Sequence, residues 1–226
     1  MILLCLKSCK LLFMNTSNHH NGLIVDAETV KTFLKDIDDE EFNENYEEWK
    51  YTLHLGKEVY VSTDDLPKRL KPREFFTIRP GDFVLLITRE QLEMPADVMG
   101  FISMRFRYKQ KGLINVSGFH VDPGYKGRLI FSAFNAGPKD IVLRENEPLF
   151  MIFFQGMDKE CKYREEPPRY LYIPSELVEN IRGRSATLSS NANRLDKLEF
   201  YMKVVGAITV ALMLSLSGVA LKHIFG

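Results

Sequence analysis

Hydrophobic and polar residues alternate, or cluster in short apolar runs, between about residues 50 and 155, as is typical of β-strands. Turn sequences such as Pro-Gly separate the runs at intervals of roughly ten residues. The runs are YTLHLGKEVYV (51–61), FTIRPGDFVLLITREQLEMP (76–95), GLINVSGFHVDPGYKGRLIFSAFNAGP (112–138) and IVLRENEPLFMIFFQ (141–155). This spacing predicts an all-β sandwich or barrel. Strand–helix alternation and the GxGxxG or GxxxxGK[ST] phosphate loops are absent from the sequence, which disfavours nucleotide-binding α/β folds.

A helical pattern precedes these strands. Asp26 is the expected N-cap, and apolar residues then recur with helical spacing at Val30, Phe33, Leu34 and Ile37. We therefore expect a short N-terminal helix. Residues 36–48 follow with eight carboxylates and no basic residue. Such a run predicts a solvated loop or helix end rather than a metal site.

The C-terminal part has a different composition. Residues 204–221 (VVGAITVALMLSLSGVAL) form an uncharged run of eighteen residues, which as a helix would span about 27 Å, close to the hydrocarbon thickness of a bilayer. Small residues within it would let helices approach closely in lipid. We interpret the run as a transmembrane helix and tail anchor. The alternative is a helix buried in a soluble core, which usually carries a polar face.

The region between the strands and this anchor, residues 176–203, is expected to be a linker and helical stalk. Apolar residues recur there with heptad spacing, at Leu188, Leu195, Leu198, Met202 and Val205. Two heptads indicate either a self-associating stalk or an ordinary helix leading to the membrane. The basic residues on the near side of the anchor are Arg182, Arg184, Arg194, Lys197 and Lys203. Their excess predicts that the barrel faces the cytoplasm.

Residues 1–21 form an N-terminal extension. Its start, MILLCLKSCKLLF, resembles a short signal sequence but contains two lysines and has no clear cleavage site. A start at Met14 is the alternative that we favour over targeting. His19 and His20 lie in a polar run and are expected to be solvated rather than metal ligands.

Charge and cysteine content exclude several classes of protein. Thirty basic residues balance thirty acidic residues, so no global field attracts a nucleic acid, and we expect no nucleic-acid partner. Three cysteines, Cys5, Cys9 and Cys161, are too few and too scattered for a disulfide framework, and their spacing from histidines does not suggest a zinc site. A reducing compartment is the simplest interpretation.

One passage carries a resemblance to a known family. GFHVDPGYKGRLIFSAFNAG (118–137) resembles the nucleotide-pocket motif of the dCTP deaminase and dUTPase superfamily. Other pieces follow in the same order as in dCTP deaminases, namely GLIVDAETVKTFL (22–34), YTLHLG (51–56), PGDFVLLITREQLEMPADVMGFI (80–102) and NEPLFMIFF (146–154). The resemblance covers about residues 22–156, and we place the barrel domain at 22–175.

This resemblance implies a dUTPase-like β-barrel that assembles as a homotrimer, with pockets for dCTP or dUTP between subunits and Mg²⁺ on the phosphates. Asp122 would hold or activate a water or the sugar 3′-hydroxyl. Tyr125 would stack against deoxyribose, and Gly124 and Gly127 would allow close approach of the backbone to the ligand. In the alternative interpretation, Asp-Pro-Gly-Tyr is only a hairpin turn.

The catalytic positions depart from the family pattern. The family's general-base Glu, ten residues after the motif Asp, corresponds to Ser132, which has no usable basicity at neutral pH. Of the family's phosphate-binding segment only Arg105 is retained, although a shift of one residue would let Arg107 substitute. The Asp of the first strand motif is replaced by Thr52, and the chain has no counterpart of the dUTPase C-terminal arm.

The basic residues of this segment, Arg105, Arg107, Lys109 and Lys111, alternate in the sequence. A strand here would put all four on one face, toward a triphosphate or toward solvent. Two functions remain open. The chain is either a membrane-tethered enzyme that deaminates or hydrolyses a deoxynucleoside triphosphate, or a binding or scaffold protein that retains the barrel without the chemistry.

Overall fold

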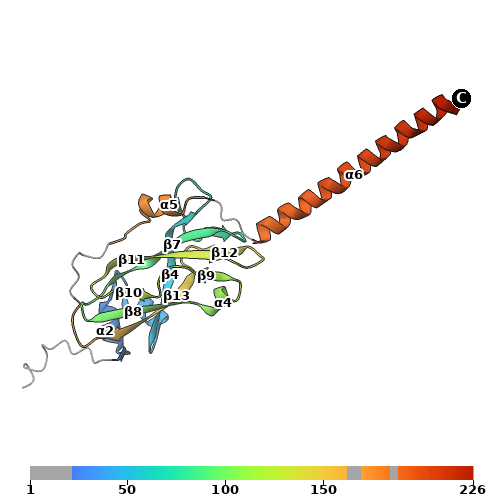
Figure 1. Ribbon diagram of the computed structural model, residues 1–226. Helices are drawn as coiled ribbons and strands as arrows, with labels where there is room; N and C mark the ends of the chain where they lie inside the picture. Colours follow the sequence, from blue (N-terminus) through green and yellow to red (C-terminus); the bar gives the residue numbers. More distant parts are fainter. Residues whose placement is uncertain (1–21, 162–168, 184–187, 226) are drawn as a thin grey trace, which may run out of the picture. The chain divides into compact units, whose positions relative to one another are not determined.

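The computed structural model describes residues 22–161, 169–183 and 188–225. It divides into two compact units, one ending at Gly183 and the other beginning at Arg184 (Figure 1). The described strands all belong to the first unit, and the second contains one long helix, α6 (Leu188–Phe225). The predicted extension at residues 1–21, with its alternative start, lies outside the described residues.

The first unit is built around one curled antiparallel sheet. Its main path runs β10-β8-β13-β4-β7-β11-β9. These strands are β4 (Lys50–Val61), β7 (Phe83–Glu93), β8 (Val98–Met104), β9 (Leu113–Asn115), β10 (His120–Val121), β11 (Lys126–Asn135) and β13 (Pro148–Gly156). The short strands β1 (Leu23–Ile24), β2 (Leu34–Lys35), β3 (Tyr46–Glu47) and β5 (Lys68–Arg69) pair with members of this path. A separate pair joins β6 (Phe75–Ile78) to β12 (Ile141–Arg144). The prediction of a mostly β, barrel-like fold is confirmed.

The main core lies on the concave side of this sheet. Along β11, Leu129, Phe131 and Ala133 are buried, whereas the residues between them are half-buried, which is the alternation of a strand with one face in the core. Phe131 stacks on Phe150 of β13, with ring centroids 3.6 Å apart. The alternation read from the sequence therefore reflects a real inner and outer face.

A second, smaller core covers part of the outer face. Helix α5 (Ser175–Ile181) places Val178 there, and Ile173 lies just before the helix. Their buried partners on the sheet are Tyr60, Leu85 and Ile87. Since α5 packs on the sheet, the compact unit continues to Gly183, and the domain boundary expected at residue 175 stays a prediction.

The opening helix is shorter than its apolar pattern predicts. α2 (Ala27–Thr32) begins at the expected cap, where the Asp26 carboxylate accepts the Thr29 backbone N–H at 2.9 Å. It ends at Thr32 because Leu34 leaves the helix and pairs with Leu92 of β7. The acidic run contains a further helix, α3 (Asp39–Asn45), which buries Phe42.

The basic segment at residues 105–111 does not form a strand. Residues 106–109 fold instead as one helical turn, α4 (Phe106–Lys109), with Arg105 as its N-cap residue. Within the turn, Arg107 contacts Glu147, and the Lys109 ammonium donates to the Ser103 hydroxyl at 2.8 Å. The condition of a strand, under which all four basic residues would share one face, is therefore not met, because charge alternation over seven residues does not separate a strand from an exposed helical turn.

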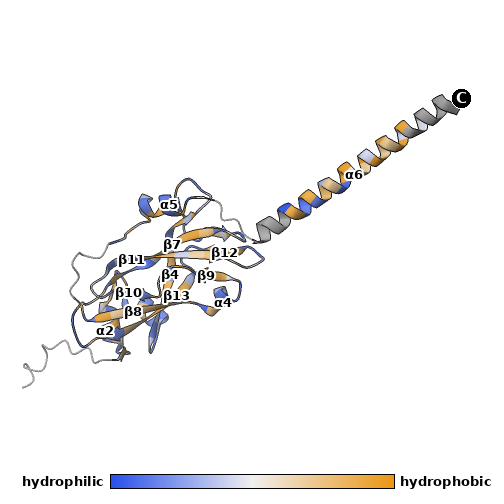
Figure 2. Cartoon of the chain, viewed as in Figure 1, coloured by the Kyte–Doolittle hydropathy of each residue, from blue (hydrophilic) through white to orange (hydrophobic). Residues whose placement is uncertain are grey.

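The second unit is the helix α6, whose segment Arg194–Leu216 is long and apolar enough to cross a membrane. None of the residues in the most apolar window of this segment is buried. Figure 2 shows hydrophobic residues recurring along this part of α6. The predicted span at 204–221 lies inside the same continuous helix.

Candidate functional site

The Asp-Pro-Gly-Tyr loop joins β10 to β11 in a fixed conformation. The Tyr125 N–H donates to the Asp122 carbonyl at 3.2 Å, closing the turn. The Gly124 N–H donates to the Pro95 carbonyl at 3.0 Å, and the Met94 N–H donates to the Tyr125 carbonyl at 2.8 Å. Gly124 has a φ of 74°, in the left-handed region that glycine adopts without steric cost. The loop is thus tied to the neighbouring residues 94–95.

Asp122 presents its carboxylate at the surface of this loop. Its side chain is 48% exposed, and Oδ1 lies 3.4 Å from Nε2 of His120. Alternation along the chain puts residues 120 and 122 on the same side, and this pairing was missed in the sequence because a lone histidine gave no signal. An exposed carboxylate beside an imidazole can accept a hydrogen bond from a ligand hydroxyl or a water.

Tyr125 is mostly inside the fold. Its side chain is buried in the main core, and its hydroxyl donates to the Arg128 carbonyl. Burial raises the pKa of this phenol, and the nearby Tyr170 adds to the effect, so the hydroxyl stays protonated. A ligand can reach only a small exposed part of the ring. Contact with a sugar therefore stays a prediction.

Gly127 allows the chain that follows the barrel to return to β11. With a φ of 140°, it sits where a Cβ would be 2.9 Å from the backbone N and O of Tyr170. Next to it, the Arg128 N–H donates to the Tyr170 carbonyl at 2.7 Å. We expected a ligand to approach the backbone closely at Gly127. In this structure the backbone of Tyr170 fills that space.

Ser132 lies on the outer face of the sheet. It pairs in register with Leu85 of β7, which in turn pairs with Tyr60 of β4. Directly opposed residues in a sheet point to the same side, so Ser132 is in one row with two members of the smaller core covered by α5. Among the described residues no histidine or carboxylate hydrogen-bonds to its hydroxyl. In the part of the chain that the structure describes, the Ser132 hydroxyl therefore has no hydrogen-bonded base to activate it.

The two candidate phosphate-binding arginines differ in availability. Arg105 is half-buried, and its backbone N–H donates to the Leu149 carbonyl at 3.0 Å. The Arg107 guanidinium donates to the Glu147 carboxylate at 2.6 Å and lies over the Tyr108 ring, 4.9 Å from its centroid. Glu147 also accepts the Tyr108 hydroxyl at 2.6 Å. Arg107 is therefore already paired.

These candidate residues do not converge within one chain. In the described parts of the protein no hydrogen bond or ion pair joins Asp122 to Arg105, Arg107 or Ser132. No group of three or more His, Cys, Asp or Glu side chains there is placed to hold a metal ion. Thr52, at the first strand motif, is buried on β4. Among the described residues, the loop at Asp122 thus brings together an acid and an imidazole without a paired lysine or arginine.

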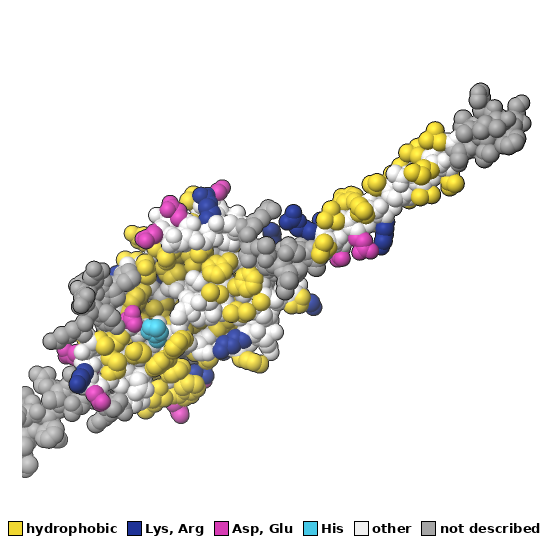
Figure 3. All heavy atoms as spheres, in the orientation of Figure 1, with side chains coloured by type: hydrophobic (Ala, Val, Ile, Leu, Met, Phe, Trp, Pro, Cys, Tyr) yellow, Lys and Arg dark blue, Asp and Glu magenta, His cyan; other side chains and the backbone are white. Residues whose placement is uncertain are grey.

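A row of aromatic rings, two exposed (Trp49 and Phe119) and two half-buried (Phe101 and Phe153), leads up to the Asp122 loop. The rings follow one another from Trp49 to Phe153, Phe101 and Phe119, with centroids 6.1, 5.7 and 6.3 Å apart. Phe119 then meets the His120 ring at 5.3 Å. Phe119 is 65% exposed, and Figure 3 shows hydrophobic side chains gathered on the surface over β8 and β13. We call these four residues the aromatic row.

The curled sheet and its Asp-Pro-Gly-Tyr loop define a domain of the dCTP deaminase and dUTPase superfamily. More specifically, the chain belongs to the dCTP deaminase-like family, whose profile matches residues 25–157. The dCTP deaminase of Pyrococcus abyssi is 31% identical over 114 residues, 50% of this chain and 71% of the relative.

Two further relatives are matched over about half of their own length. The dCTP deaminase of Idiomarina loihiensis is 32% identical over 93 residues, 41% of this chain and 48% of the relative. The crystal structure of the Agrobacterium tumefaciens 2′-deoxycytidine 5′-triphosphate deaminase superposes with a TM-score of 0.50 and 16% identity, covering 61% of this chain and 50% of that one. This likeness shows the fold.

Proposed function

We propose that this protein is a membrane-tethered, trimeric member of its family that binds a deoxynucleoside triphosphate, dCTP or dUTP, without deaminating it. The observation that supports binding is the rigid loop that exposes the Asp122 carboxylate beside His120. The relatives' names supply the substrate class. Arg105 of a neighbouring subunit would then meet the phosphates. Any Mg²⁺ would arrive with those phosphates, because the described residues offer no ligand cluster.

The lack of deamination follows from Ser132. Attack of water on the cytosine C4 needs a base to take the water proton, and losing such a base typically lowers the rate by about 10²–10⁴-fold. Ser132 is neutral and lies beside Leu85 and Tyr60 instead of a histidine or carboxylate. A second candidate function, an active deaminase or a pyrophosphate-hydrolysing enzyme, is favoured only by Asp122, which would have to act as that base itself.

Calorimetric titration with dCTP and dUTP tests the nucleotide proposal. We expect binding that weakens at least tenfold in Asp122→Asn, since the neutral amide loses a charge-assisted hydrogen bond (about 1.5–3 kcal/mol). Asp140→Asn, at an exposed position, should bind like the unaltered protein. Tyr125→Ala is unsuitable as a test because it would empty part of the core.

An ammonia-release assay on the same samples tests the absence of deamination. We expect no turnover of dCTP above the uncatalysed rate. Sustained turnover would overturn the non-catalytic part of the proposal and identify Asp122 as the first base to test. If neither nucleotide binds, the nucleotide proposal is wrong, and the scaffold alternative is favoured.

The aromatic row supports assembly into a homotrimer. Monomers rarely leave contiguous apolar surface exposed, and a subunit interface on this face would cover it next to Asp122. We expect light scattering to give a trimer for the unit ending at Gly183. Phe119→Lys should lower the mass toward a monomer, because it places a charge among the rings. Phe75→Lys, an equally exposed phenylalanine on β6, should stay trimeric. A monomeric unaltered unit would overturn the trimer.

Membrane tethering is the remaining part of the proposal. Its support is the apolar and exposed Arg194–Leu216 segment of α6. The basic residues that precede the apolar part of the helix favour a cytoplasmic barrel. A protease added to sealed membrane vesicles prepared with their cytoplasmic face outward should digest the barrel, and full protection would contradict this orientation.

A further inference from the structure

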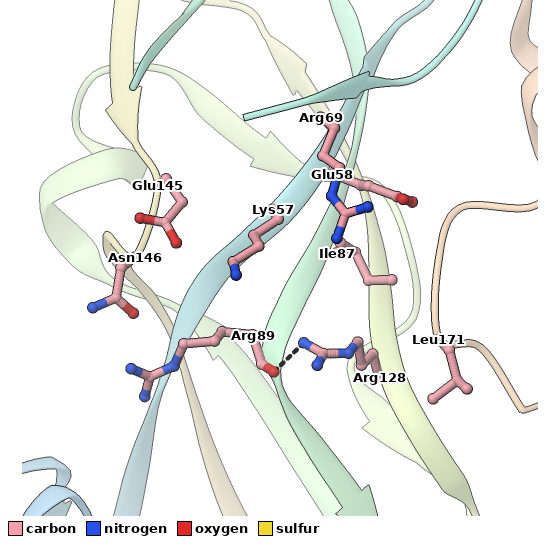
Figure 4. A pocket seen from close by; sticks show the side chains of 9 residues that line it. All are labelled: Lys57, Glu58, Arg69, Ile87, Arg89, Arg128, Glu145, Asn146 and Leu171. Atoms are coloured by element: carbon pink, nitrogen blue, oxygen red, sulfur yellow. Dashed lines mark hydrogen bonds between the residues drawn. The ribbon is translucent and has the colours of Figure 1, made fainter. Parts of the chain in front are cut away.

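A cavity lies on the outer face of the sheet, and none of its lining residues belongs to the Asp122 loop. Its volume is about 480 Å³, within the usual range for sites that bind small molecules. The lining residues are Lys57, Glu58, Arg69, Ile87, Arg89, Arg128, Glu145, Asn146 and Leu171. They come from four strands, the turn before β13 and the segment that returns to β11 (Figure 4).

Two of the cations that line this cavity are uncompensated. In the described parts of the chain, neither the Lys57 ammonium nor the Arg69 guanidinium has a hydrogen bond or an ion pair. Figure 4 shows both side chains extending into the space between the strands, from β4 and from β5. Neither residue was singled out by its sequence pattern, because the two meet only through the pairing of β4 with β5.

The other two cations of the lining, Arg128 and Arg89, differ in whether a carboxylate compensates their charge. Arg128 donates to the Thr88 carbonyl at 3.1 Å and to the Arg89 carbonyl, and these neutral acceptors leave its charge in place. Arg89 is compensated, because its guanidinium contacts Glu41 and also Glu90, the latter at 3.0 Å. Three positive charges therefore face the cavity without a paired carboxylate.

Both carboxylates of the lining are bonded to backbone amides. Glu58 accepts the Ile173 N–H at 2.9 Å, and Glu145 accepts the Arg73 N–H at 3.2 Å. The lining as a whole carries four basic and two acidic side chains. Cations in a partly enclosed site attract anions more strongly than the same cations on an open surface.

We propose that this cavity binds a phosphate-bearing small molecule, with Lys57, Arg69 and Arg128 on its phosphates. Guanidinium and ammonium donors match phosphate oxygens in geometry and charge. Ile87 and Leu171 add an apolar wall against which a non-phosphate part can pack. The site is separate from the proposed nucleotide site and does not depend on it. Inorganic oligophosphate and a nucleoside triphosphate share this chemistry, and the test distinguishes them.

The test is calorimetric titration of the full-length protein in detergent micelles with inorganic tripolyphosphate. The double variant Lys57→Gln, Arg69→Gln should bind at least about 100-fold more weakly, since each lost charge-assisted contact costs about a factor of ten or more. Glu145→Gln should bind more tightly, because it removes a negative charge from the lining. The control, Arg79→Gln with Lys139→Gln, changes two exposed cations elsewhere and should bind normally.

A second titration with dCTP separates this site from the Asp122 loop. Asp122→Asn should leave tripolyphosphate binding unchanged, whatever happens to dCTP. If the Asp122→Asn protein retains dCTP binding that the Lys57 and Arg69 changes remove, the cavity also accepts nucleotides. If the cavity binds tripolyphosphate but not dCTP, its ligand is an oligophosphate that needs no nucleobase. Tripolyphosphate that fails to bind, or that binds the double variant as tightly as the unaltered protein, overturns the proposal.

Discussion

Glu90→Ala is expected to lower the free energy of unfolding of the barrel by about 3–5 kcal/mol. The Glu90 side chain is fully buried, and its two oxygens serve three donors. Oε2 accepts the His54 backbone N–H at 2.9 Å, and Oε1 lies 2.6 Å from His54 Nδ1 and 3.0 Å from the Arg89 guanidinium. Truncation leaves a buried amide without its acceptor and removes one of the two carboxylates that compensate Arg89.

Urea unfolding of the unit ending at Gly183, followed by tryptophan fluorescence of Trp49, measures this change. Glu44→Ala is the matched control, because Glu44 is exposed on α3 and its loss should change stability by less than about 0.5 kcal/mol. The stability loss of Glu90→Gln should lie between those of Glu90→Ala and Glu44→Ala, since the amide oxygen can still accept a hydrogen bond from His54. A loss below about 1 kcal/mol for Glu90→Ala would show that water replaces the carboxylate in this network.

Membrane association should depend entirely on α6. Full-length protein is expected to sediment with membranes and resist extraction by carbonate, whereas the unit ending at Gly183 should stay in the supernatant. The physical reason is the apolar, exposed segment Arg194–Leu216. A charged residue at the centre of a membrane helix costs about 2.5–3.5 kcal/mol on insertion scales, so two such residues should abolish insertion.

A variant of equal length tests this directly. Ala211→Arg with Leu212→Arg should move the protein to the soluble fraction, while Ala211→Leu with Leu212→Ala conserves composition and should remain in the membrane. Equal distribution of the two variants would show that the helix does not insert. Sedimentation of the truncated unit with membranes would place the attachment on the barrel instead.

The strands were predictable because each long strand buries one face. The alternation along β11 and the run in β7 follow directly from that requirement. The short helices were less predictable. α2 ends early because Leu34 pairs with β7, and α5 forms because Val178 finds the smaller core. Both outcomes depend on contacts with residues that are distant in the sequence. A local sequence pattern carries no information on such contacts.

The candidate site was predictable only where it is local. The Asp122 loop is one continuous stretch, so its residues could be identified together. His120 carried no signal by itself, and the aromatic row joins four strands or turns through side-chain contacts. The cavity is likewise assembled from residues more than one hundred positions apart, such as Lys57 and Leu171. Such groups become visible only when the sheet register is known.

The position of Ser132 beside the smaller core has a consequence for substitutions there. A glutamate at this position would need structural changes beyond the single substitution. The new carboxylate would stand in the cross-strand row of Leu85 and Tyr60, under the influence of an apolar cover that α5 has already completed. Desolvation there would favour the protonated acid. The packing of α5 therefore makes a general base difficult to gain at position 132 by one substitution alone.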